Sequence, residues 1–220
     1  DGEIYTQQPD ATPKKVAIEL VRDDRPQFAN LQSSDGATSA VVSPDGKQIA
    51  FTLRGEVFVT SADYATTKQV THTPAREAGL SFATDNRTLA YASERGGNWQ
   101  LYLAKIARKE DPNFPNATLI EEEVLLPSTT VERAYPQFSP DGKMLAIAAS
   151  GEAFNKIGLK IAPGQTSNMA DGQLFLYDPA SKQANPVTKD FNPSVQNFVW
   201  NKGDKQIYLQ GEDKDCVRLY

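Results

Sequence analysis

The sequence contains very few of the residues from which most catalytic and metal sites are built. Its 220 residues include one histidine, His72, and one cysteine, Cys216. A serine triad needs a histidine base beside its nucleophile, and no G-x-S-x-G nucleophile elbow occurs. One histidine and one distant cysteine cannot supply the ligands of a zinc site, and a single cysteine cannot form an internal disulfide. The sequence therefore predicts no catalytic residue, no metal and no cofactor in this chain.

Long apolar runs and a one-sided charge are also missing. No stretch approaches the roughly 18 apolar residues of a membrane-spanning helix. The net charge is −5 with acidic and basic residues mixed along the chain, so no basic stripe indicates nucleic-acid binding. The acidic groups at 121–123 and 213–215 lack the spacing of a calcium loop, which favours solvated strand ends. We therefore expect neither a membrane span nor a nucleic-acid partner.

One ten-residue phrase, by contrast, is present in four copies. The copies are VSPDGKQIAF (42–51), FATDNRTLAY (82–91), FSPDGKMLAI (138–147) and WNKGDKQIYL (200–209). They begin at Val42, Phe82, Phe138 and Trp200, and the shortest spacing, 40 residues, is the length of a four-stranded propeller blade. We expect these four residues at equivalent ends of equivalent strands. Their repeated position, like that of Trp99, indicates core packing rather than ligand stacking.

Each copy has the composition of a tight turn between two strands. In the first copy Pro44 presets φ, Asp45 bonds the local backbone and Gly46 takes the left-handed conformation that closes the hairpin. We expect a positive φ at Gly46 and Gly142, and Asn86 replaces the glycine in the second copy. The apolar flanks predict a strand on each side of every turn.

Matching segments after each hairpin extend the unit to four strands. The segments 55–61, 97–106 and 172–178 predict third strands, and short fourth strands end near positions 71, 125 and 188. The predicted fold class is therefore all-β, a β-propeller segment of four-stranded antiparallel blades. We expect one domain, 1–220, with blades at 38–71, 78–127 and 134–189, a partial blade at 195–220, and the outer strands of a preceding blade at 1–22.

The predicted blades do not obviously close into a ring. An unclosed ring would expose an apolar blade face larger than soluble monomers tolerate, which predicts that the segment is part of a larger ring. A small ring sealed by strands from both ends of the chain is the alternative.

Insertions between strands are the expected recognition surfaces, because loops on a rigid scaffold usually carry specificity. The segment 150–172 is far longer than a normal hairpin loop. Propeller topology places it on one face with the loops 72–78 and 128–134, and places a second insertion, 107–118, on the opposite face. The predicted rim contacts are His72, Arg76, Glu77, Glu132, Arg133, Asn155 and Lys156. The simpler interpretation of 150–172 is a variable surface loop.

The phrase SPDG-K-x-[I/L]-A, with NWQLYLAKI (98–106) and VTHTPAREAGLSF (70–82), resembles the propeller repeats of TolB and of tricorn-like serine peptidases. The segment 54–102 is most similar to the N-terminal propeller of secreted bacterial tricorn-like peptidases. This resemblance implies a non-catalytic segment, periplasmic or secreted. It would gate or position a peptide or protein substrate for a serine peptidase domain elsewhere in the parent chain.

The resemblance also leaves an alternative, a TolB-like periplasmic protein-interaction module with no enzymatic activity. A third class, a lyase or hydrolase acting within the propeller, is disfavoured because the sequence lacks the polar residues that it needs. Peptidase activity of the parent is implied by the resemblance alone.

Overall fold

The computed structural model describes residues 4–9, 12–16, 35–126, 134–160, 171–203 and 206–220. The chain divides into two compact units, Asp1–Asp35 and Gly36–Tyr220. Strands dominate the described residues, and none of the short helices there is long and apolar enough to cross a membrane. The prediction of an all-β chain is confirmed.

The first unit contains one short antiparallel hairpin, β1 (Tyr5–Thr6) paired with β2 (Lys14–Lys15). The backbone N–H of Val16 donates to the carbonyl of Ile4 at 2.9 Å and extends the pairing by one step. Residues 17–22 of the predicted outer strands lie outside the described residues. The assignment of this hairpin to a preceding blade stays a prediction.

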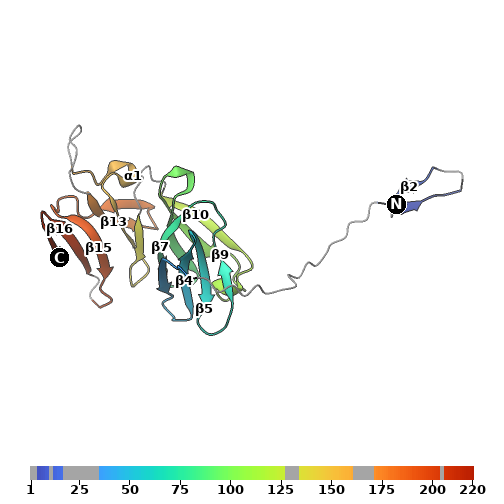
Figure 1. Ribbon diagram of the computed structural model, residues 1–220, viewed down its shortest axis with the longest axis horizontal. Helices are drawn as coiled ribbons and strands as arrows, with labels where there is room; N and C mark the ends of the chain where they lie inside the picture. The colour runs from blue at the N-terminus through green and yellow to red at the C-terminus, as the bar shows by residue number, and fades with distance from the viewer. Residues whose placement is uncertain (1–3, 10–11, 17–34, 127–133, 161–170, 204–205) are drawn as a thin grey trace. The chain divides into compact units, whose positions relative to one another are not determined.

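Four antiparallel sheets follow one another along the second unit (Figure 1). Within each sheet, every strand pairs with the next one in sequence, which is the arrangement of propeller blades. The first sheet contains β3 (Ser39–Val42), β4 (Gln48–Leu53), β5 (Glu56–Ser61) and β6 (Thr67–Gln69), and the second contains β7 (Glu77–Phe82), β8 (Thr88–Ser93), β9 (Gln100–Ile106) and β10 (Ile120–Leu126). The third sheet contains β11 (Tyr135–Phe138), β12 (Leu145–Ser150), β13 (Gly172–Asp178) and β14 (Gln183–Pro186), and the fourth contains β15 (Ser194–Trp200), β16 (Ile207–Asp213) and β17 (Cys216–Leu219). The predicted fold class is confirmed.

The four copies of the phrase occupy equivalent places in these sheets. Val42, Phe82, Phe138 and Trp200 are the last residues of β3, β7, β11 and β15, each of which is the first strand of its sheet. This prediction is confirmed. The turn after each of these strands therefore leads into the second strand of the same sheet.

The turns have the local chemistry that their residues predict. The Ser43 hydroxyl donates to Asp45 Oδ1 at 2.6 Å, and the Gly46 N–H donates to the Ser43 carbonyl at 2.9 Å. The φ angles are 74° at Gly46, 57° at Asn86 and 70° at Gly142. The predicted left-handed conformation is confirmed at all three positions.

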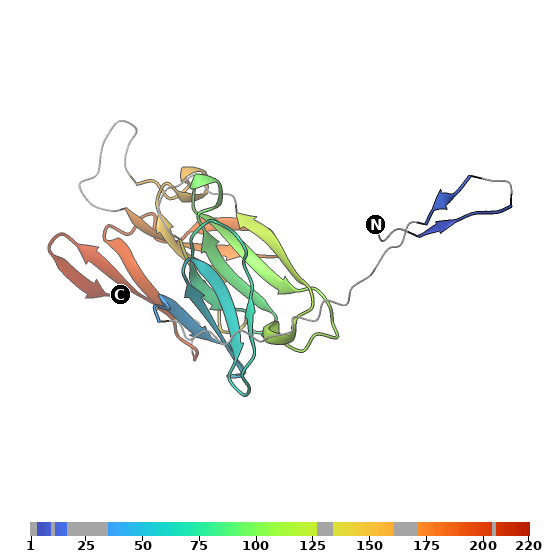
Figure 2. The ribbon, with the colours of Figure 1, turned by 45° about the vertical axis from the view of Figure 1, so that its right-hand side comes forward.

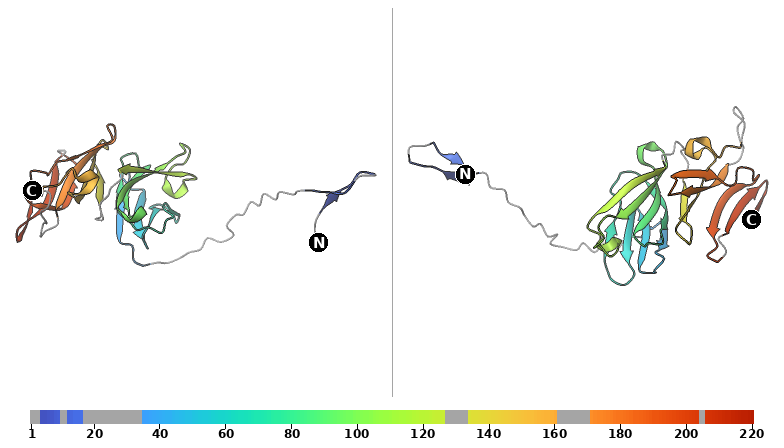
Figure 3. Two further views of the ribbon diagram at one scale, coloured as in Figure 1. Left: turned by 90° about the horizontal axis from the view of Figure 1, so that it is seen from above. Right: turned by 180° about the vertical axis from the view of Figure 1, so that it is seen from behind.

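The hydrophobic core lies between consecutive sheets, which Figure 3 shows side by side. One buried cluster joins the first two sheets and a second joins the second and third. A third, smaller cluster of Ala146, Leu174 and Val195 joins the third and fourth. The middle strand β8 is buried along its whole length because a sheet covers it on each side.

A glycine permits the close approach of the third and fourth sheets. The N–H of Gly172 donates to the Ser194 hydroxyl at 2.9 Å. A Cβ at position 172 would lie 2.1 Å from the carbonyl oxygen of Val195. The backbones of β13 and β15 are thus too close for any larger residue.

Candidate functional site

Three loops meet at one edge of the sheets, and we call them the rim: 71–76 before β7, 94–99 between β8 and β9, and 151–160 after β12. Figure 2 shows the loop between β8 and β9 and the short helix α1 (Ala153–Lys156) at the same edge, and Figure 1 shows the turn between β11 and β12 at the opposite edge. The N–H of Glu94 donates to the Arg76 carbonyl at 2.9 Å. Trp99 and Phe154 belong to one buried cluster. Backbone bonding and side-chain packing therefore connect the three loops.

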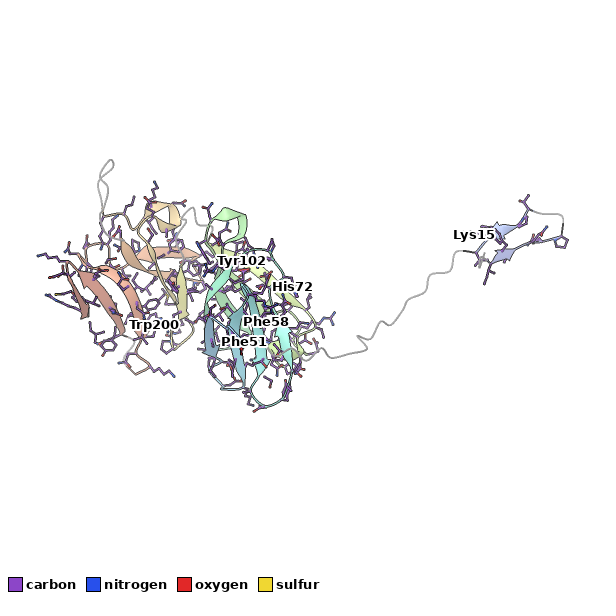
Figure 4. The ribbon with its side chains drawn as sticks, viewed as in Figure 1. Lys15, Phe51, Phe58, His72, Tyr102 and Trp200 are labelled. Atoms are coloured by element: carbon purple, nitrogen blue, oxygen red, sulfur yellow. The ribbon has the colours of Figure 1, made fainter. Side chains whose placement is uncertain are left out.

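The structure brings five of the seven predicted rim contacts to this edge. His72, Arg76, Asn155 and Lys156 are exposed, and Figure 4 labels His72. Glu77 differs from the prediction of an exposed contact, because it is the first residue of β7 and only 2% exposed. Glu132 and Arg133 lie outside the described residues. Of the predicted contacts, the other four are available to a partner, beside the exposed rim residues Glu94 and Glu152.

The loop 71–76 is held by the carboxylate of Glu56, at the start of β5. Glu56 Oε2 accepts from the Thr71 hydroxyl at 2.5 Å, and Oε1 accepts from the Thr73 N–H at 2.9 Å. The Thr71 hydroxyl oxygen also accepts from the Val57 N–H at 2.8 Å. These bonds fix the backbone on both sides of His72. The imidazole therefore projects from an ordered loop.

Glu77 is buried because loop and strand groups surround its carboxylate. Oε1 accepts from the Thr73 hydroxyl at 2.9 Å and lies 3.4 Å from a guanidinium nitrogen of Arg95. Burial raises the pKa of the Glu77 carboxyl, against the lowering effect of these partners. The carboxylate joins the loop 71–76 to the loop 94–99 and does not contact solvent.

Arg95 is the residue that ties this network to the rest of its blade. It lies in the short 3-10 helix η1 (Arg95–Gly97) and pairs with Glu122 of β10 at 2.7 Å. Its guanidinium carbon lies 4.3 Å from the ring centroid of Tyr102, a cation–π distance. The Tyr91 hydroxyl also donates to Glu122, and burial together with this contact raises the pKa of the hydroxyl.

Glu77 and Ser93 are directly opposite one another on β7 and β8. The Ser93 hydroxyl lies beside the Glu77 carboxyl, and its hydrogen bond acts to lower the pKa of that carboxyl, against the larger effect of burial. The buried carboxyl is therefore surrounded by groups of the loop 71–76, of β8 and of the loop 94–99.

The loop 151–160 contains a turn of unusual backbone geometry. Phe154, Asn155 and Lys156 have φ angles of 53°, 63° and 64°, the left-handed region that residues with a Cβ rarely adopt. The Phe154 ring is buried and packs edge-to-face on Phe175, with centroids 4.9 Å apart. The buried ring anchors the turn, and Asn155 and Lys156 are left exposed at its tip.

The base of the same loop is held by a half-buried lysine. The Lys160 ammonium lies 3.8 Å from Asp171 Oδ1 and donates to the carbonyls of Phe191 and Pro193. Burial lowers the pKa of Lys160, and the charge of Asp171 opposes that shift. Both ends of the described part of the loop are thus attached to the blades.

Sequence reasoning missed Arg95 and Glu122. All three glutamates of the run 121–123 are exposed, as expected, and Glu122 in addition bonds to Arg95 and Tyr91. Three consecutive glutamates show no alternation, so the sequence held no signal that singled out Glu122. Within the described ranges, no group of three or more His, Cys, Asp and Glu side chains is arranged to hold a metal ion.

Comparison with known proteins defines the fold of the chain. No protein-family model matches it, and no curated protein matches it in sequence. Among solved structures, TolB from Acinetobacter baumannii shares 16% identity at a TM-score of 0.62, over 94% of this chain and 43% of that one. The putative TolB from Agrobacterium tumefaciens shares 16% identity at 0.57, over 99% of this chain and 69% of that one.

A peptidase is also similar. Dipeptidyl peptidase 4 from Porphyromonas gingivalis shares 13% identity at a TM-score of 0.51, over 86% of this chain and 31% of that one. The chain thus spans less than half the length of this peptidase and of the first TolB. At these identities the similarity shows the fold, and at that level the predicted resemblance to TolB-like propeller repeats is confirmed.

Proposed function

We propose that this chain is a non-catalytic β-propeller segment that recognises a protein or peptide through its rim. The left-handed turn at Phe154, Asn155 and Lys156 carries the proposal. Three consecutive residues in this conformation are costly, and such strain persists where surrounding structure enforces it and often marks a binding site. The buried Phe154 ring supplies that enforcement, so the exposed tip is ordered before any partner arrives.

Four exposed rim side chains, His72, Arg76, Asn155 and Lys156, can donate hydrogen bonds, and two exposed glutamates, Glu94 and Glu152, can accept them. A peptide backbone offers carbonyl acceptors and N–H donors of matching chemistry. The ordered backbone on both sides of His72 reduces the entropy that a partner's binding would cost. A peptide or an extended protein segment is therefore the ligand class that fits the rim.

Within this function, the first proposal is that the segment gates or positions substrate for a serine peptidase domain elsewhere in the parent chain. The peptidase among the structural neighbours supports it, together with the sequence resemblance at 54–102. In this proposal the blades, with hairpin β1–β2 as outer strands of a preceding blade, belong to one larger ring. The match of the segment 2–8 to 55–61 supports that arrangement.

The second proposal is a TolB-like protein-interaction module with no enzymatic role. The two TolB structures favour it, because they match more of this chain, at higher TM-scores, than the peptidase does. Both proposals place the protein in the periplasm or outside the cell.

A peptide hydrolysis assay distinguishes a catalytic segment from a non-catalytic one. Residues 1–220 alone should cleave no peptide, and cleavage that is lost in His72→Ala would overturn the non-catalytic assignment. If the peptidase proposal holds, Arg76→Ala combined with Lys156→Ala in the parent should change turnover of long substrates and leave short peptides unaffected. Lys182→Ala together with Lys214→Ala is the matched control, because both lysines are exposed on other turns.

Equal profiles for the rim variant and the control would remove the gating role. The TolB-like proposal would then require that the rim variant loses a defined periplasmic partner that the control retains. Retention of every partner by both variants would contradict recognition through the rim.

A further inference from the structure

A pocket of about 390 Å³, partly open to solvent, lies at the edge opposite the rim. It is between the turn that joins β11 to β12 and the turn that follows β15, and Figure 4 labels Trp200 beside it. Met144 and Trp200 are apolar residues of its lining, and the exposed Asp141 and Lys202 also line it. The indole N–H of Trp200 donates to the Gln137 carbonyl at 3.2 Å, which fixes the ring. The prediction that Trp200 packs in the core agrees with the structure, since the ring packs against the cluster of Ala146, Leu174 and Val195, and its half-buried part also lines this pocket.

The corresponding place between the first two sheets is filled by an aromatic side chain. Phe114 lies in the 3-10 helix η2 (Phe114–Asn116), within the insertion 107–118. Its ring is fully buried and packs edge-to-face on Phe82, with centroids 6.0 Å apart. Its N–H donates to Gln48 Oε1 at 2.9 Å. The insertion 107–118 thus places the Phe114 ring between the first two blades.

The two places correspond at two positions of the repeated phrase. Gln48 and Met144 are the seventh residues of the first and third copies. Phe82 and Trp200 are the first residues of the copies that follow them, the second and the fourth. Gln48 and Phe82 hold Phe114, whereas Met144 and Trp200 face the pocket.

We propose that this pocket binds an aromatic side chain from a short segment of a partner protein, in the way that Phe114 is held between the first two blades. The site is separate from the rim and does not depend on the rim's proposed role. Its occupant is a turn-forming peptide whose aromatic residue is preceded by acidic residues, as Phe114 is preceded by Glu110 and Asp111.

The chemistry of the walls favours an aromatic ring over an aliphatic side chain. A methionine sulfur makes favourable contacts with ring edges, and an indole packs edge-to-face or offset with a second ring. At the mouth, Asp141 Oδ1 accepts from the Ser139 hydroxyl at 2.7 Å and from the Lys143 N–H at 3.1 Å, so this carboxylate is engaged in its own turn. The Asp141 carboxylate keeps its negative charge in these bonds, and Lys202 balances it. Loss of the Lys202 charge would therefore leave the pocket repulsive toward a peptide with acidic residues.

The pocket differs from its counterpart in a way that sets the expected affinity. Met144 cannot accept the backbone hydrogen bond that Gln48 accepts from Phe114. The ligand is therefore held by ring packing and charge, without that bond, and binding should be reversible and weak. We expect a Kd of about a millimolar or somewhat tighter for an isolated peptide.

The test uses residues 1–220 and a synthetic peptide with the sequence of positions 110–118, EDPNFPNAT. The indole N–H resonance of Trp200 reports binding in two-dimensional NMR, with the buried Trp99 as internal reference. We expect a saturable shift of the Trp200 resonance. Replacement of the peptide's phenylalanine by alanine should weaken binding at least tenfold.

Three variants locate the site and leave Met144 and Trp200 unchanged. Lys202→Glu should weaken peptide binding about threefold or more. Lys182→Glu makes the same charge change on an exposed turn elsewhere and should leave peptide binding unchanged. Lys156→Ala at the rim should also bind the peptide normally, which separates this site from the rim.

Four results would overturn the proposal. The first is a Trp200 resonance that does not shift at a peptide concentration of 10 times the expected Kd, and the second is equal affinity for the alanine and phenylalanine peptides. The third is an equal loss of peptide affinity in Lys202→Glu and Lys182→Glu. The fourth is binding of phenylalanine amide as tightly as the peptide. The last result would indicate a cavity that binds any aromatic ring and does not recognise a peptide.

Discussion

Replacing Lys156 by glycine should stabilise the protein while weakening the rim. Lys156 is exposed and has a φ of 64°, so its side chain contributes little burial while its Cβ is in an unfavourable conformation. Glycine adopts this conformation without the Cβ clash. The substitution therefore separates backbone strain from side-chain recognition at one position.

The size of the effect follows from two opposing contributions. A left-handed conformation costs a residue with a Cβ roughly 1–2 kcal/mol. Glycine loses about 0.5–1 kcal/mol more backbone freedom on folding. The two ranges leave a net change between about 0 and 1.5 kcal/mol, and its centre, a gain of about 0.7 kcal/mol, corresponds to a rise in Tm of about 1–3 °C for a unit of this size.

The measurement is thermal unfolding of residues 1–220, with Lys182→Gly as the matched control. Lys182 is an exposed lysine with a φ of 56°, in the turn between β13 and β14 and outside the rim. Both variants should gain stability. Only Lys156→Gly should weaken recognition by the rim.

A fall in the Tm of Lys156→Gly together with a rise in that of Lys182→Gly would refute the strain argument at the rim. It would mean that the lysine side chain contributes more to this turn than the left-handed backbone costs.

Two further predictions concern packing and pH. Gly172→Ala should lower the free energy of unfolding by about 1–3 kcal/mol, because its Cβ would lie 2.1 Å from the Val195 carbonyl oxygen. The control Gly203→Ala, whose Cβ would lie 3.8 Å from its nearest neighbour, should change the free energy of unfolding by no more than about 0.5 kcal/mol. Equal losses in the two variants would contradict the packing argument. For Glu77, burial raises the folded-state pKa, so protonation favours the fold and stability falls as pH rises above about 4.3. Glu77→Gln should lack this fall, so its Tm relative to the unsubstituted protein should increase from pH 4 to pH 7; a constant difference would show that Glu77 does not titrate with unfolding.

The sequence alone was sufficient for the blade and its turns. Four copies of one phrase predicted the sheets, the ends of their first strands and the positive φ at Gly46, Asn86 and Gly142. These features depend on residues within a few positions of one another. Proline, aspartate and glycine set the turn through their own φ preferences and local hydrogen bonds, whatever the rest of the chain does.

Tertiary structure decided what the side chains at the two edges do. Glu77 is buried because Arg95, 18 positions along the chain, closes over it, and Arg95 is in turn held by Glu122 of another strand. The left-handed turn after Gly151 depends on a Phe154 ring that packs on Phe175 of the next strand. Burial and strain of this kind are set by contacts between distant residues, and a local pattern does not specify them.

The pocket shows the same division within one repeated motif. The sequence placed Gln48 and Met144, and Phe82 and Trp200, at matching positions of the phrase. Only the packed structure shows that an insertion from the second blade fills one place with Phe114, and that the other stays partly open. The phrase determines the backbone at both places, whereas the space between two blades is determined by whichever side chains their separate sequences bring to it.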